Sequence, residues 1–266
     1  MRQTTPRRDR DLDTEQHGVD WEAFLALAAT FKPWKPGPRG PHAPLRDRAF
    51  AEVVRSPVLG RADLRLNGLL SPPKQQGMSN ACTSFAIAAA AEAAVRKKLR
   101  PPVTLAPWFI HTCLMHCPPD QGVYIGAAMP NVLGAGIAFT SDSDQPFPET
   151  LCGTPDRLHL AGAYQVPDAQ AAKAALDNKD VVVCTIFVRW ADFAYLAPNA
   201  VYAYDPDAQA STHSVCLVGY DDAAGYWIIQ NSQGAGWSDH GFGRIAYDTC
   251  GLLASPGSGD AVAVLA

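Results

Sequence analysis

The sequence lacks the features that place a chain in a membrane or on nucleic acid. No apolar run reaches the roughly 18 residues that a membrane-spanning helix needs. The net charge of the 266 residues is −4 at pH 7, and only 18% of them are charged. A domain that binds nucleic acid usually carries a basic patch and a basic overall balance. We therefore expect neither a membrane nor a nucleic-acid partner.

Signals for conventional export are also missing. The charged N-terminus, MRQTTPRRDRDLDTEQHG, is not followed by the apolar segment of a Sec-type signal peptide. The chain has no Asn-x-Ser/Thr site for N-glycosylation. A cytoplasmic location, or export by a non-classical route, is the interpretation that fits.

The cysteines do not indicate a disulfide scaffold. There are seven, an odd number that leaves at least one without a partner in the chain. Cys184 and Cys216 lie in apolar runs, VVVCTIFV and SVCLVGY, that are typical of buried strands. We expect both to be reduced core residues, and a mostly reduced chain fits this pattern best.

Residues 1–59 form an N-terminal extension with a composition of its own. A charged tail, expected to be disordered, precedes apolar residues at helical spacing from Trp21 to Phe31 and then a proline-rich linker. The extension has a small excess of basic residues, whereas the remainder is acidic. We expect it to dock on the main domain as a short propeptide or lid. The alternative is a mobile linker that carries one short amphipathic helix.

Residues 60–266 are expected to fold as one α+β domain with two lobes. Helices are predicted over residues 81–99, 106–117 and 125–135, so the lobe at about 60–165 is mainly helical. In the second lobe, at about 166–266, runs of β-branched and aromatic residues predict strands at 181–188, 200–204, 214–220, 226–230 and 243–247. Helices followed by successive strands indicate an α+β fold, and a cleft between two lobes is a natural active site.

A cysteine at the start of the alanine-rich helix is the first candidate for chemistry. Cys82 follows the loop QGMSNA and precedes the run TSFAIAAAAEAAV. The first turn of a helix has unpaired N–H groups and partial positive charge, which stabilise a thiolate. A lone cysteine is as often a small buried hydrophobe. Cys82 is therefore a candidate nucleophile only if the chain also supplies the groups that activate one.

Suitable partners lie far along the chain. His213 begins one predicted strand and Asn231 ends another. A nucleophilic thiol needs an imidazole to take its proton, and the imidazole needs a third group to orient it. The attacked carbonyl needs donors aimed at the developing oxyanion, a role suited to the side chain of Gln76 and the backbone N–H of Cys82.

These segments together resemble the papain family of cysteine peptidases, and the chain is similar to a divergent, bacterial-type member. The order and spacing of Cys82, His213 and Asn231 are those of that family. The stretch from Gln76 to Phe85 resembles its nucleophile segment, and HSVCLVGY resembles its histidine strand. The run YWIIQNSQGAGWSDHGF resembles its asparagine segment and is the most specific match. The resemblance covers the chain from about Arg61 to its C-terminus.

The resemblance implies a fold, an activity and a site. The fold would be a papain-like α+β structure, with a helical lobe, an antiparallel barrel-like β lobe and the active site in the cleft. The enzyme would hydrolyse peptides or proteins without a metal or other cofactor. Cys82 would be the nucleophile, His213 the acid and base, Asn231 the orienting group and Gln76 the oxyanion donor. The substrate-binding residues implied are Gly126, Ala127, Met129, Thr212, Ser214, Gln233 and Ser255.

Three departures from the family pattern lie close to the expected site. Thr83 replaces the aromatic residue that normally follows the nucleophile, and Asn80-Ala81 replace a Gly-Ser or Gly-Ala pair. Gln233 replaces the tryptophan that normally shields the His–Asn hydrogen bond from water. We therefore expect this bond to be wetter and weaker than in the family.

The family's disulfide pattern is mostly absent as well. Ser79 stands where one of its cysteines would be. Only Cys113 and Cys152 lie roughly where a family disulfide joins parts of the helical lobe, and the state of this pair is left open.

Other interpretations stay open beside the peptidase. The run HTCLMHC contains ligand types that zinc prefers, but on one helix its four His and Cys side chains would spread over several faces, which favours packing. The same thioester chemistry would also serve a transamidase, another acyltransferase or a small-amide hydrolase. A binding homologue with impaired catalysis is the third alternative.

Overall fold

The computed structural model describes residues 58–98, 100–205, 207, 210–253 and 261–266. All of these residues belong to one compact unit. Residues 1–57 lie outside the described residues, and so does nearly all of the expected N-terminal extension, with its tail, helices and proline-rich linker.

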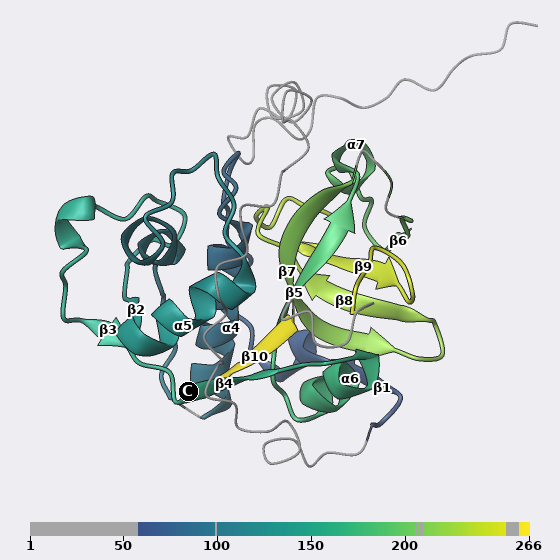
Figure 1. Ribbon diagram of the computed structural model, residues 1–266. Helices are drawn as coiled ribbons and strands as arrows, with labels where there is room; N and C mark the ends of the chain where they lie inside the picture. Colours follow the sequence, from purple (N-terminus) through teal and green to yellow (C-terminus); the bar gives the residue numbers. More distant parts are fainter. Residues whose placement is uncertain (1–57, 99, 206, 208–209, 254–260) are drawn as a thin grey trace, which may run out of the picture. The chain divides into compact units, whose positions relative to one another are not determined.

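An eight-stranded sheet forms the larger part of the fold (Figure 1). Its strand order is β4-β10-β5-β7-β8-β9-β6, with β1 paired to β7 beside this path. Among the strand pairs of the described residues, only β6–β9 is parallel. The strand bounds are β1 Arg61–Asp63, β4 Gly162–Gln165, β5 Val182–Val188, β6 Val201–Tyr202, β7 Ser211–Asp221, β8 Tyr226–Gln230, β9 Phe242–Ala246 and β10 Ala261–Leu265.

Most of the helices come from the first part of the domain, and they lie outside the main sheet (Figure 1). The principal helices are α4 Cys82–Lys97, α5 Ile125–Ala135 and α6 Ala169–Asp177. Shorter turns are η1 Leu64–Asn67, the π-helix η2 Phe109–Leu114, η3 Glu149–Leu151 and α7 Trp190–Phe193. A small second sheet pairs β2 Ile137–Ala138 with β3 Arg157–Leu158.

The sequence-based elements are largely confirmed. The helices expected at 81–99 and 125–135 and the five expected strands all form, with small shifts at their ends. The helix expected at 106–117 is instead the shorter π-helix η2. Strands β1 and β4 fall within 60–165 yet pair in the main sheet, so the expected lobe boundary at residue 165 is crossed by two strands.

Helix α4 runs through the core because alanine dominates its sequence. Its residues from Thr83 to Val95 are all buried, and small side chains let a helix approach a sheet closely. The helix packs on the central strand β7. Since α4 begins at Cys82 and β7 carries His213, this packing brings two candidate site residues from distant parts of the chain together.

Strand β7 is held at the centre of the sheet by β5 on one side and β8 on the other. Its register with β8 shifts between Leu217 and Gly219. A Cβ at Gly219 would lie 2.4 Å from the carbonyl oxygen of Ala62. Position 219 therefore leaves room only for glycine, because β1 pairs with β7 there.

Candidate active site

Cys82 is the first residue of α4 and its side chain is partly exposed. Burial by itself raises the pKa of the Cys82 thiol, but the hydrogen bond and charge of His213 act against it. Hydrogen bonds from the backbone and hydroxyl of Ser214 act in the same direction as His213, and the net pKa lies below the ordinary value of a thiol. A thiol that ionises readily supplies thiolate, which is the form of cysteine that attacks a carbonyl carbon.

The His213 ring lies between Cys82 and Asn231. Its Nε2 is 2.7 Å from Asn231 Oδ1. The backbone N–H of Ser232 donates to the same Oδ1 at 2.8 Å, which identifies this atom as the amide oxygen. An amide oxygen only accepts hydrogen bonds, so Nε2 carries a proton and donates it to Asn231. The other ring nitrogen is therefore the one that takes a proton from Cys82.

The bond between His213 and Asn231 is dry, contrary to the expectation drawn from Gln233. His213 is 1% exposed and Asn231 is 3% exposed. The ring of Trp190, in α7, meets the imidazole edge-on with centroids 5.0 Å apart, and that of Phe193 does so at 5.8 Å. Aromatic rings from a different element thus cover the imidazole, and the loss of tryptophan at position 233 does not open it to water.

Gln76 is held in one orientation by two hydrogen bonds. Its Nε2 donates to the carbonyl oxygen of Ser79 at 2.6 Å, and its Oε1 accepts from the hydroxyl of Ser232 at 2.5 Å. Its backbone N–H donates to the carbonyl oxygen of Ser232 at 2.9 Å. One amide proton of Nε2 is left for a further acceptor, so the side chain suits the expected role of an oxyanion donor.

Sequence reasoning missed Ser232 and Trp190. Ser232 directly follows Asn231, and its N–H and hydroxyl fix two different candidate site residues, Asn231 and Gln76. Its place beside Asn231 is a signal that the sequence does contain. Trp190 follows the end of β5 and no local pattern marks it, because it meets His213 only through the pairing of β5 with β7.

The expected substrate-binding residues have different environments. Gly126 and Ala127 lie in the first turn of α5 and are at least partly exposed. Thr212 is partly exposed on β7, beside His213. The side chains of Ser214 and Gln233 are buried. Met129 is fully buried in the core, so its side chain lines no open pocket and we leave it out of the substrate site. Ser255 lies outside the described residues.

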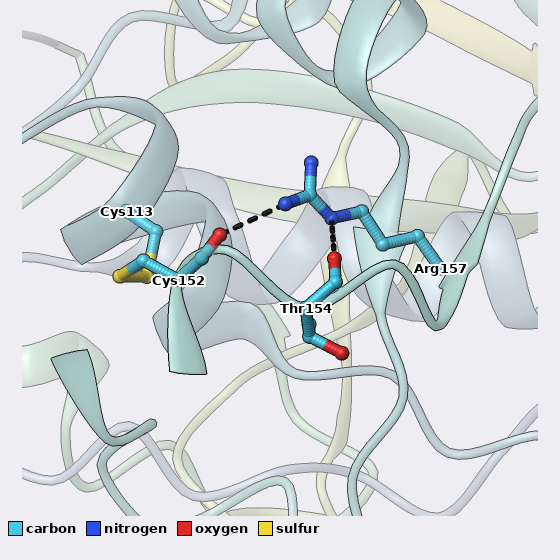
Figure 2. The surroundings of a disulfide bond; sticks show 4 residues. All are labelled: Cys113, Cys152, Thr154 and Arg157. Atoms are coloured by element: carbon cyan, nitrogen blue, oxygen red, sulfur yellow. Dashed lines mark hydrogen bonds between the residues drawn. A yellow bond between two sulfur atoms is a disulfide. The ribbon is translucent and has the colours of Figure 1, made fainter. Parts of the chain in front are cut away.

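Cys113 and Cys152 form a disulfide, 39 residues apart in sequence (Figure 2). Arg157 braces the second of these segments, because its guanidinium donates to the carbonyl oxygens of Cys152 at 2.8 Å and Thr154 at 2.7 Å. The other five cysteines are free. Cys184 and Cys216 are buried thiols, as the sequence predicts.

The HTCLMHC segment is engaged in structural contacts. Cys113 is in the disulfide, and Nε2 of His111 lies 3.0 Å from the carbonyl oxygen of Pro118. Within the described ranges, no group of three or more His, Cys, Asp and Glu side chains is arranged to hold a metal ion. The same ranges contain no helix that is long and apolar enough to cross a membrane.

Comparison with known proteins places most of the chain in one family. A family model described as papain family cysteine protease matches residues 60–258. Cathepsin K of Mus musculus is 26% identical over 204 residues, which cover 71% of this chain and 61% of cathepsin K. A senescence-specific cysteine protease of Arabidopsis thaliana is 27% identical over 207 residues, covering 71% of this chain and 59% of that protein. The chain thus spans about three fifths of the length of these curated relatives.

Solved structures give the same fold. Procathepsin L 3 of the Tenebrio molitor larval midgut aligns with a TM-score of 0.66 and 20% identity, over 80% of this chain and 72% of that one. The bromelain protease of Ananas comosus, solved in complex with the E64 inhibitor, aligns with a TM-score of 0.62 and 23% identity, over 78% of this chain and 99% of that one. The expected α+β fold with two lobes is confirmed.

Proposed function

Because the chain belongs to the papain family of cysteine proteases, we propose that it is a cysteine endopeptidase that works through a thioester on Cys82. The observation that carries this proposal is the chain of contacts from Cys82 through His213 to Asn231. It supplies a thiol with a lowered pKa, a base with a defined tautomer and a buried orienting group. Those are the three parts that nucleophilic catalysis at a peptide carbonyl requires.

The resting site would hold a Cys82 thiolate beside a His213 imidazolium. The thiolate attacks the peptide carbonyl carbon, a sulfur–carbon bond forms, and negative charge moves to the carbonyl oxygen. The free amide proton of Gln76 and the N–H of Cys82 stabilise that oxyanion. The carbon–nitrogen bond then breaks, and the amine leaves with a proton from His213.

Water completes the reaction. His213, now neutral, takes a proton from water as the water attacks the thioester carbonyl. The sulfur–carbon bond breaks, the acid product leaves, and the thiolate–imidazolium pair is restored. Trp190 and Phe193 keep other water away from the His213–Asn231 bond during this cycle.

Gly126 is suited to hold the substrate backbone. As the second residue of α5, its N–H has no acceptor within the helix. Its carbonyl would normally accept from the residue four positions later, but that residue is Pro130, which has no N–H. Helix formation therefore leaves both polar groups of Gly126 available to an extended peptide or protein substrate. Thr212 and Ala127 are the other expected contacts that remain at least partly exposed.

The proposal is tested by turnover of an internally quenched peptide library under mildly reducing conditions. Cys82→Ala and His213→Ala should each abolish turnover. Cys117→Ala is the matched control, because Cys117 is another partly exposed free cysteine and should be replaceable without loss. If either site variant keeps turnover near that of the wild type, the assignment is wrong.

We further propose that residues 1–59 dock on the site as a short inhibitory segment. Among the solved relatives, one is a procathepsin and another was determined in its proform. Incubation of the full chain should then show activity rising as intact mass analysis shows the extension being removed. Constant activity throughout removal would exclude inhibition by this segment.

We also infer that the protein acts in an oxidising compartment, which favours export over the cytoplasm. The Cys113–Cys152 disulfide supports this choice, because such bonds persist mainly outside reducing compartments. Alkylation of protein from its native source, unfolded in denaturant before any reduction, should modify the five free cysteines only. Modification of all seven would contradict the inference.

A further inference from the structure

The residue that directly follows Cys82 is bonded to loop 118–124, which leads into α5. The hydroxyl of Thr83 donates to the carbonyl oxygen of Val123, and the two oxygens are 2.6 Å apart. The same Oγ1 lies 2.8 Å from Oγ of Ser214 in β7, and Thr83 is only 2% exposed. The nucleophile helix, the central strand and the loop therefore meet at one buried hydroxyl.

Asn80, two residues before Cys82, is attached to the same loop. Its backbone N–H donates to the carbonyl oxygen of Pro119 at 2.7 Å, and its side-chain Nδ2 donates to that of Asp120 at 2.7 Å. Asn80 and Thr83 thus bond to loop 118–124 from both sides of the nucleophile. They are also two of the positions at which the sequence departs from the family pattern.

The loop ends where the first turn of α5 begins. Tyr124 is the N-cap residue of this helix, and its carbonyl oxygen accepts from the N–H of Ala127 at 3.1 Å and of Ala128 at 3.0 Å. The carbonyl of Val123 belongs to the planar peptide group that joins Val123 to Tyr124, so a hydrogen bond to this oxygen fixes the plane of that group. The first turn of α5, which contains Gly126, is therefore held in place relative to the start of α4.

We propose that Asn80 and Thr83 form a clamp that holds loop 118–124 against the start of α4 and so positions Gly126 to bind the substrate backbone. Both are positioning residues, because they act through the loop and not on the reacting atoms. The clamp thus gives the residues beside the nucleophile a role in substrate binding. Its catalytic consequence rests on the proposed function, whereas its hold on the loop does not.

The kinetic test compares two substrates of the full chain, which is first incubated until its peptidase activity is constant. An internally quenched peptide has backbone groups for Gly126 to bind, whereas p-nitrophenyl acetate has no peptide group and reports on Cys82 alone. Thr83→Val has nearly the shape of threonine but donates no hydrogen bond. It should lower kcat/KM for the peptide about tenfold, mainly through a higher KM, while its rate on the acetate ester should not fall. Asn80→Ala removes only the side-chain bond of Asn80 and should raise KM for the peptide about two- to threefold.

Two further variants separate the hydroxyl from packing. Thr83→Ser keeps the donor and should stay within about twofold of the wild type on both substrates. Thr249→Val is the matched control and should change neither, because Oγ1 of Thr249 also donates to a carbonyl oxygen, that of Ala246 at 2.9 Å. The proposal is overturned if Thr83→Val loses equally on both substrates or loses nothing on the peptide, or if Thr83→Ser behaves like Thr83→Val. Urea unfolding midpoints check folding, and if the valine variant is unfolded the same outcomes apply to Thr83→Ala, which differs from Thr83→Ser only by the hydroxyl.

Hydrogen exchange followed by mass spectrometry gives a readout that needs no turnover. The amide protons of Ala127 and Ala128 should exchange about tenfold faster in Thr83→Val than in Thr249→Val, and at the wild-type rate in Thr83→Ser. Unchanged exchange in Thr83→Val would overturn the clamp even in an active enzyme. If the wild type cleaves no peptide, the proposed function fails, and the exchange rates still decide whether the clamp exists.

Discussion

The ion pair between Lys74 and Glu92 is the most deeply buried charge pair among the described residues. Lys74 Nζ lies 2.7 Å from Glu92 Oε1, and the two side chains are 5% and 1% exposed. The same Oε1 accepts the backbone N–H of Leu105 at 2.8 Å. The pair joins the segment that leads to Gln76 with the middle of α4, the helix that begins at Cys82. The pair therefore fixes the segment that carries Gln76, the proposed oxyanion donor, to the helix that begins at the nucleophile.

Replacing one partner should be far more damaging than replacing both. Lys74→Met leaves the Glu92 carboxylate buried without a counter-charge, and such a loss costs about 3–5 kcal/mol of unfolding free energy. For a domain of this size the melting temperature falls by roughly 2–4 °C for each kcal/mol. We therefore expect a decrease of roughly 6–20 °C for this single variant.

The double variant Lys74→Met/Glu92→Gln should recover most of the loss. It contains no buried charge, and the glutamine oxygen still accepts the N–H of Leu105. Glu92 Oε2 has no hydrogen-bond partner among the described residues, so an NH₂ group in its place breaks no existing bond. We expect the double variant to lie within about 1–2 kcal/mol of the wild type.

Urea unfolding without reductant, which keeps the disulfide intact, measures these differences. Arg61→Met is the control, because Arg61 pairs with Asp221 at 3.5 Å while its own side chain is 67% exposed. An exposed pair contributes at most about 1 kcal/mol. The reasoning is refuted if Lys74→Met costs no more than the control, or if the double variant is as unstable as the single one.

Three further predictions follow from the site and its surroundings. Near pH 6, iodoacetamide should add to Cys82 alone. The pKa of the Cys82 thiol is lowered, whereas burial raises the pKa of Cys216 to about 12 and also raises those of Cys117 and Cys250. Adducts that form on several cysteines at equal rates would contradict this prediction. Asn231→Ala should lower kcat for peptide hydrolysis by about 10- to 150-fold, since it removes a hydrogen bond to a charged imidazolium, worth about 1.5–3 kcal/mol. Kinetics equal to those of the wild type would show that Asn231 has no role in the site. Cys113→Ser/Cys152→Ser should lower the unfolding free energy by about 3–4 kcal/mol, because the disulfide closes a loop of 39 residues in the unfolded chain. Urea unfolding measures this difference. Added reductant should destabilise the wild type but not the variant.

The sequence contains enough to predict α4 and the central strands, because their signals are local. The alanine run after Cys82 and the β-branched runs of β5 and β7 favour one structure over many consecutive residues. Strand β1 is different, since it has three residues, Arg61–Asp63, and becomes a strand only through its pairing with β7. No local pattern indicates such a strand.

The same distinction applies to the site. Cys82, His213, Asn231 and Gln76 follow from motifs that a family resemblance makes visible. The replacement of an aromatic residue by Thr83 is equally visible, but its hydroxyl partner Ser214 is 131 residues away and no spacing rule connects them. The prediction that water reaches the His213–Asn231 bond was wrong for the same reason. The identity of residue 233 does not indicate that the ring of Trp190, in α7, covers the imidazole.

The central claim is that the reaction passes through a thioester on Cys82. The most direct measurement is the intact mass of the protein after it is mixed with a slowly hydrolysed peptide ester and quenched in acid within the first turnover. The account predicts a mass gain equal to the acyl part of the ester, with peptide mapping that places it on Cys82, and no gain in Cys82→Ala. Turnover of the ester without any adduct on Cys82, or with the adduct on another residue, would contradict it.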